Sequence, residues 1–179
     1  MDFAATSGNL GVGKGVRSYY GEELNIPPLG SLTTGSHNIA LGDRSNSHII
    51  KGSYNFTFGQ DSMHHTGDYS TSDSNVAIGY GCLGGYTTED ETYVLPRARY
   101  NVALGQKAMG FQVTGAWDAD YNHSYHVAIG YETLLLQGAC QFNTATGFRA
   151  GYLNSFMINN GGGTIEESYN TYVGLLADV

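Results

Sequence analysis

The 179-residue chain has few charged residues, few prolines and few cysteines, and each shortage excludes a class of protein. Charged residues make up 13%, about half the share in an ordinary domain, which disfavours long solvated amphipathic helices. Three prolines beside 26 glycines, without a three-residue period, exclude collagen and a proline-rich disordered chain. Cys82 and Cys140 form no CxxC pair, so we expect two free thiols rather than a zinc ribbon or a disulfide scaffold.

Basic residues and long apolar runs are also scarce. Eight Lys and Arg against 16 Asp and Glu give a net charge of −8, which repels a phosphate backbone, so nucleic acid is not an expected partner. No stretch of 18 apolar residues exists, and the beginning of the chain lacks the charged-then-apolar order of a secretory signal. We therefore expect no membrane insertion, and synthesis in the cytoplasm. With 41% hydrophobic residues the chain is expected to fold, and its length favours one domain.

A five-residue cassette recurs along the chain, with the form Asn, apolar, Ala or Thr, apolar, Gly. The starts of its eight copies lie 17 to 29 residues apart, and an aromatic residue often precedes the Asn. The clear copies are NIALG at 38–42, NFTFG at 55–59, NVAIG at 75–79, NVALG at 101–105 and HVAIG at 126–130. The weaker copies are NLGVG at 9–13, NTATG at 143–147 and NTYVG at 170–174.

The alternation within a cassette predicts a short strand with one large and one small face. In the copy at 101–105, Tyr100, Val102 and Leu104 share one face, and Asn101, Ala103 and Gly105 share the other. The glycine that ends every cassette predicts a turn at positive φ, where a residue with a Cβ is strained.

Such short strands at repeated intervals predict an all-β fold, a β-solenoid or β-roll of about eight rungs with inserted loops. Eight rungs at about 4.8 Å would give a rod of roughly 38 Å. So thin a rod buries little apolar surface, and the stabilisation from that burial barely offsets the conformational entropy lost when the chain folds. We therefore expect an obligate homo-oligomer. We assign residues 31–179 to the repeat domain and residues 1–30 to an N-terminal cap or docking segment with a degenerate first rung.

The cassettes with their small following residues resemble the head repeats of trimeric autotransporter adhesins and the NTAIGYxAL-type repeats of phage tail fibres and tailspikes. The match is best at 75–83, 101–109 and 126–134. The resemblance implies a left-handed β-roll packed or intertwined as a homotrimer, with the apolar cassette positions in its core. These core positions of the solenoid or trimer are Ile39, Leu41, Val76, Ile78, Val102, Leu104, Val127 and Ile129.

The cassette intervals are more variable than in the adhesins, which implies loops on some rungs, and we expect no export signal, coiled-coil stalk or membrane anchor. This combination favours a phage virion component: a trimeric fibre or fibre tip that binds a host-surface receptor or glycan and contacts other virion proteins. Two alternatives stay open, a head-decorating or neck fibre with an assembly role only, and a tailspike-like polysaccharide depolymerase.

Function is expected on the inserted loops, because loops on a rigid scaffold carry binding residues. The loop at 115–125 combines aromatic faces, which suit the C–H faces of sugars, with carboxylates and amides that suit their hydroxyls. In the alternative interpretation Trp117 only covers the adjoining rung. The candidate receptor-binding or glycan-binding residues are Trp117, Asp118, Asp120, Tyr121, Asn122 and Tyr125.

The titratable residues indicate no enzyme and no cofactor. Asp118 with Asp120, or the similarly spaced glutamates of the loop at 85–100, could pair as in a glycosidase, but alternating acids are common in loops without catalysis. His37 and His126 lie at or beside cassette starts, so a trimer would repeat each of them three times and could form an ion site. We favour instead a histidine that stacks between rungs and hydrogen-bonds to the backbone.

Overall fold

The chain forms a rod of short parallel strands in the computed structural model. Its described residues contain fourteen strands and no helix. These residues are 8–14, 27–30, 32, 34–47, 49–64, 70–84, 97–112, 122–137, 141–152 and 169–177.

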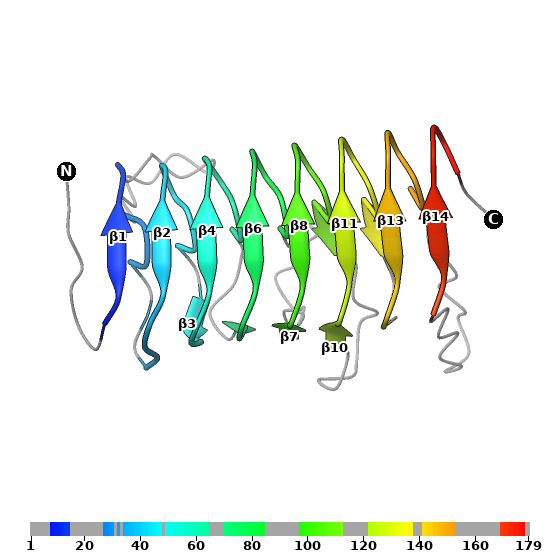
Figure 1. The fold of residues 1–179 in the computed structure, drawn as a ribbon. Helices are drawn as coiled ribbons and strands as arrows, with labels where there is room; N and C mark the ends of the chain where they lie inside the picture. The colour runs from blue at the N-terminus through cyan, green and yellow to red at the C-terminus, as the bar shows by residue number, and fades with distance from the viewer. Residues whose placement is uncertain are drawn as a thin grey trace, which may run out of the picture.

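Eight three-residue strands form one parallel sheet in chain order, as Figure 1 shows from blue to red. They are β1 (Leu10–Val12), β2 (Ile39–Leu41), β4 (Phe56–Phe58), β6 (Val76–Ile78), β8 (Val102–Leu104), β11 (Val127–Ile129), β13 (Thr144–Thr146) and β14 (Thr171–Val173). Each is the centre of one cassette, and equivalent residues lie side by side, as Ala77 does beside Ala103. The expected all-β solenoid of eight rungs is confirmed, and the degenerate first rung pairs with β2 like the others.

Strands of two or three residues form the remaining sides of the rungs. In the second set β3 pairs in parallel with β5 and β7 with β10. β7 and β10 end directly before the residue that precedes the cassette, and β3 and β5 end three residues before it. A third pair, β9 with β12, follows the cassette turn. Their bounds are β3 (Ile49–Lys51), β5 (Ser70–Thr71), β7 (Arg97–Arg99), β9 (Phe111–Gln112), β10 (Asn122–Ser124) and β12 (Leu136–Gln137).

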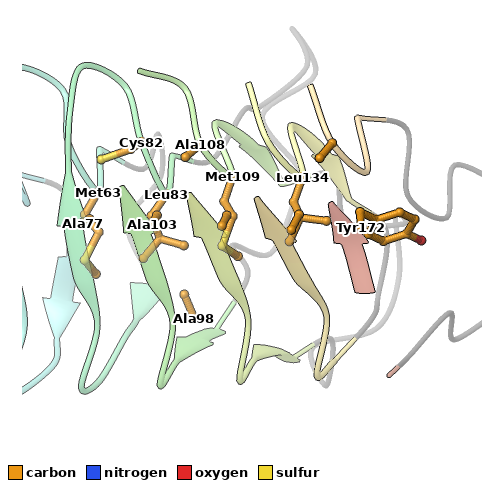
Figure 2. Packing of buried hydrophobic residues seen from close by; sticks show 13 residues of the cluster. Met63, Ala77, Cys82, Leu83, Ala98, Ala103, Ala108, Met109, Leu134 and Tyr172 are labelled. Carbon is orange, nitrogen blue, oxygen red and sulfur yellow. The ribbon is translucent and has the colours of Figure 1, made fainter. Parts of the chain in front are cut away.

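The interior is filled by small residues of the sheet and large residues of the turn that follows it. Ala77 and Ala103, at strand centres, are fully buried, and so are Met63, Leu83 and Met109 from the turns. Figure 2 shows these turn residues in a row beside the sheet, one per rung. A small residue at the strand centre, alanine in most rungs and Thr57 in β4, leaves room for a turn residue of this size inside so narrow a rung.

The eight apolar residues predicted for the core do not form the interior of the single chain. They flank the strand centres and point outward, where they are partly exposed. The two-faced alternation is confirmed, but the small face is the inner one. The residues on the outer face are Ile39, Leu41, Val76, Ile78, Val102, Leu104, Val127 and Ile129.

The glycines that end the seven cassettes from 38–42 to 170–174 form a column with φ of 127° to 137°, which confirms the expected positive-φ turn there. Gly13, which ends the first cassette, has no positive φ, so the expectation is wrong for that rung. The glycines of the column are required by close stacking as well. A Cβ on Gly105 would lie 2.3 Å from the carbonyl oxygen of Gly130 in the next rung. On Gly174, in the last rung of the sheet, the same atom would meet nothing within 4 Å.

Candidate functional site

Of the predicted receptor-binding residues, the structure describes only Asn122 and Tyr125. Trp117, Asp118, Asp120 and Tyr121 lie outside the described residues. Asn122 begins β10, where its backbone pairs with β7, and nothing further is described of its side chain. Tyr125 alone has a described side chain, which belongs to a column of aromatic rings.

The residue that precedes the cassette Asn places one side chain per rung along a single line. Every residue at this position from His37 onward has φ between +56° and +65°, so their side chains leave the backbone in the same direction. The rings of Tyr100, Tyr125, Phe142 and Tyr169 stack consecutively, with centroids 4.8 to 5.1 Å apart. His37 stacks in the same way on Tyr54, at 5.0 Å. We call this line the ring column.

The ring column is exposed and is interrupted once. The rings of Tyr54, Tyr100, Tyr125, Phe142 and Tyr169 are all exposed at the surface. Ser74 occupies the position between Tyr54 and Tyr100 and has no ring. The aromatic residues before the cassettes are evident in the sequence, but their stacking follows only from the in-register rungs.

The cassette asparagines form a second, buried line, the asparagine ladder. Asn75 donates from Nδ2 to Asn55 Oδ1 at 3.0 Å and to Ala98 O at 2.8 Å. Its own Oδ1 accepts the backbone N–H of Asn101 at 3.0 Å and its side-chain amide at 3.1 Å. Because each side chain satisfies the backbone of the next rung, the ladder fixes the register of the solenoid.

His126 takes the place of asparagine in one rung of this ladder. Its ring is fully buried, and Nδ1 accepts the backbone N–H of Asn143 at 3.2 Å. Its own backbone N–H donates to Asn101 Oδ1 at 2.9 Å. The expectation of a rung-stacking histidine bonded to the backbone is therefore confirmed for His126. His37 lies instead in the ring column, 2.9 Å from the hydroxyl of Ser36.

Alternating charges occupy the turn that follows the glycine column. Glu132, with 7% of its side chain exposed, lies 2.7 Å from Arg149 Nε and 3.9 Å from Lys107 Nζ. Burial alone would raise the pKa of Glu132, but hydrogen bonds from Tyr131 and Arg149 and the charges of Arg149 and Lys107 lower it below its ordinary value. The carboxylate is thus held charged, as part of the rung-to-rung packing.

The thiol of Cys82 is buried in the interior. Burial raises its pKa to about 11, against the opposing effect of a hydrogen bond with the Ser62 hydroxyl 3.3 Å away. A thiol protonated at neutral pH is a poor nucleophile. Cys82 therefore acts as a small apolar residue of the core.

The described part of the chain offers no metal centre, since no three His, Cys, Asp or Glu side chains within it are placed to hold an ion. No helix able to cross a membrane occurs among the same residues. Comparison with protein-family models, with curated proteins and with solved structures finds no match to this chain.

Proposed function

We propose that the protein is a structural fibre of a phage virion, a homotrimer that forms a fibre or fibre tip and binds a receptor or glycan on the host surface. The trimer number and the virion location rest on the resemblance of the cassettes to fibre and adhesin-head repeats. The physical need for a partner rests on the outer face of the sheet.

The outer face carries the proposal of self-association. Each of the six sheet strands β1, β2, β4, β6, β8 and β11 presents two apolar residues on this face, for example Val76 with Ile78 and Val102 with Leu104. All of these residues are partly exposed. Parallel sheets are usually covered on both faces, and a contiguous exposed apolar patch marks an interface. Packing this face against identical chains would bury it and widen the rod.

Light scattering tests the oligomer. We expect a species of three times the 19.2 kDa chain mass. Val102→Glu, which places a charge on the outer face, should lower this mass, whereas the same charge in Gln106→Glu, exposed in the adjoining turn, should not. The unfolding midpoint of the unsubstituted protein should also rise with its concentration, as coupled association requires. A stable, folded 19.2 kDa species would contradict the proposal.

The receptor-binding part rests on the inserted loops and on the exposed rings beside them. Aromatic rings are enriched at the energetic centres of interfaces. Labelled protein should adsorb to host cells, and Trp117→Ala should weaken adsorption while the oligomer mass stays unchanged. Unchanged adsorption of this variant would remove the loop at 115–125 from the site, and lack of adsorption by the unsubstituted protein would favour an assembly role only.

A further inference from the structure

The backbone of the ring column continues without a break across Ser74. Ser74 has φ 58°, between 61° at Tyr54 and 56° at Tyr100. Its N–H donates to Ser53 O at 2.9 Å, and the N–H of Tyr100 donates to Asp73 O at 3.1 Å. The rungs are therefore stacked here as elsewhere. What the column lacks at Ser74 is an aromatic ring and not a rung.

Among the residues that the structure describes, no ring thus lies between the two aromatic faces. Tyr54 covers one face on His37, and Tyr100 covers one face on Tyr125, so the other face of each is directed toward Ser74. Two rung intervals separate them by about 10 Å, which accommodates one six-membered ring about 5 Å from each. The side chains are open to solvent, with 62% of Tyr54 and 52% of Tyr100 exposed.

Charged residues directly precede Ser74 and Tyr100 in the chain, next to this gap in the column. Asp73 and Arg99, the residues before Ser74 and Tyr100, form an ion pair of 3.4 Å between Oδ2 and Nε. Asp73 Oδ1 accepts the backbone N–H of Ser53 at 2.9 Å, which holds the carboxylate of the residue before Ser74 in place. The side chains of Asp73 and Arg99 are 37% and 42% exposed, so both can still reach a ligand.

We propose that the gap at Ser74 is a saccharide-binding site, in which one pyranose ring of a host-surface glycan lies between Tyr54 and Tyr100. The C–H faces of the sugar contact the two rings, and its hydroxyls bond to Asp73, Arg99 and the Ser74 hydroxyl. This inference deepens the proposed function and rests on it for the source of the glycan.

The polar border favours a sugar over an aromatic side chain of a protein partner. An aromatic ring inserted between Tyr54 and Tyr100 would complete the stack but would leave Asp73 and Arg99 with few groups to bond. A pyranose offers hydroxyl donors to the carboxylate and hydroxyl acceptors to the guanidinium around its whole edge.

Saturation-transfer NMR with free glucose, galactose, N-acetylglucosamine, rhamnose and glucuronic acid tests the site. At least one of these sugars should bind the unsubstituted protein. Ser74→Phe fills the gap with a ring that the column already accepts at Phe142, and it should weaken binding at least tenfold without unfolding the protein. Tyr100→Ala, which removes one wall, should weaken binding about tenfold.

Two control variants separate the gap from the rest of the column. Ser74→Ala keeps the gap open and should change the affinity less than about threefold, the effect of one hydroxyl bond. Tyr169→Ala removes an exposed ring at the far end and should leave the affinity unchanged. Binding of none of the five sugars, binding that survives Ser74→Phe, or binding of p-cresol in place of any sugar would overturn the proposal.

Adsorption to host cells distinguishes this proposal from the proposed function. If unsubstituted protein and Ser74→Phe adsorb equally well, the fibre function stands and the saccharide site is wrong. If neither adsorbs while a sugar still binds in solution and Ser74→Phe abolishes that binding, the saccharide site stands and host attachment is wrong.

Discussion

Replacing Asn75 by leucine removes one member of the asparagine ladder while keeping its approximate volume. The side chain makes four hydrogen bonds inside the rod, two as donor to Asn55 and Ala98 and two as acceptor from Asn101. Of the groups left without a partner, the buried backbone N–H of Asn101 is the most costly, because it loses the Oδ1 of Asn75 that accepts its hydrogen bond.

The expected loss of stability follows from these contacts. An orphaned N–H costs about 1–3 kcal/mol, and each of the three other bonds contributes about 0.5–1.5 kcal/mol. Asn75→Leu should therefore lower the free energy of unfolding by about 2.5 to 7.5 kcal/mol, a large part of the stability of a typical domain. Urea unfolding followed by circular dichroism, at one protein concentration for all variants, measures this loss.

Asn170→Leu is the matched control, because it makes the same change in the last strand of the sheet. The backbone N–H of Asn170 keeps its bond to Asn143 Oδ1 at 2.9 Å, and no strand of the described residues lies beyond β14. This variant should lose less than about 1.5 kcal/mol. Equal losses in the two variants, or a loss below about 1 kcal/mol in Asn75→Leu, would refute the ladder as the source of rung register.

The other predictions concern the glycine column, the charged turn and the thiol. Gly105→Ala should prevent close stacking of the next rung and lower the urea midpoint severely, whereas Gly174→Ala, with a similar φ but open space, should show only the strain of about 1–3 kcal/mol. Because the pKa of Glu132 is lower in the folded protein, its carboxylate stabilises the fold above the ordinary pKa of 4.5, and this stabilisation is lost as the pH falls below that value. The urea midpoint should therefore drop between pH 6 and pH 3, and less so in Glu132→Gln; equal drops would contradict the role of its pairing with Arg149. Cys82 should react with iodoacetamide only after unfolding, as mass spectrometry of the peptide would show; rapid labelling of the folded protein would contradict its burial.

The sequence predicted the rungs because their signals are local. The Asn at the start, the alternation in the middle and the glycine at the end specify a short strand and its turn within five residues. Gly105 shows why the repeat can be recognised in the sequence, since glycine is required there both by its positive φ and by the carbonyl of the next rung. The stacking constraint acts in each rung that has a following rung, and a glycine stands at this position in all eight cassettes.

Which face of the strand lies inside was not predicted. The resemblance placed Val102 and Leu104 in the core of the solenoid or trimer, but the interior of the chain accommodates Ala103 because Met109 from the turn occupies the remaining space. The volume available inside the rung decides which face lies inward. That volume depends on turn residues such as Met109, whose position relative to the strand does not follow from the sequence alone.

The number of rungs, the strand within each and the glycine turns follow from the sequence, because these depend on residues adjacent in the chain. Which residues of neighbouring rungs lie side by side depends on the three-dimensional arrangement. The stacking of Tyr100 on Tyr125, the ladder from Asn75 to Asn101 and the gap at Ser74 all depend on the register of segments 20 or more residues apart. The loops between cassettes vary in length, so sequence spacing carries no measure of that register, which is set by the hydrogen bonds between rungs, including those of the asparagine ladder.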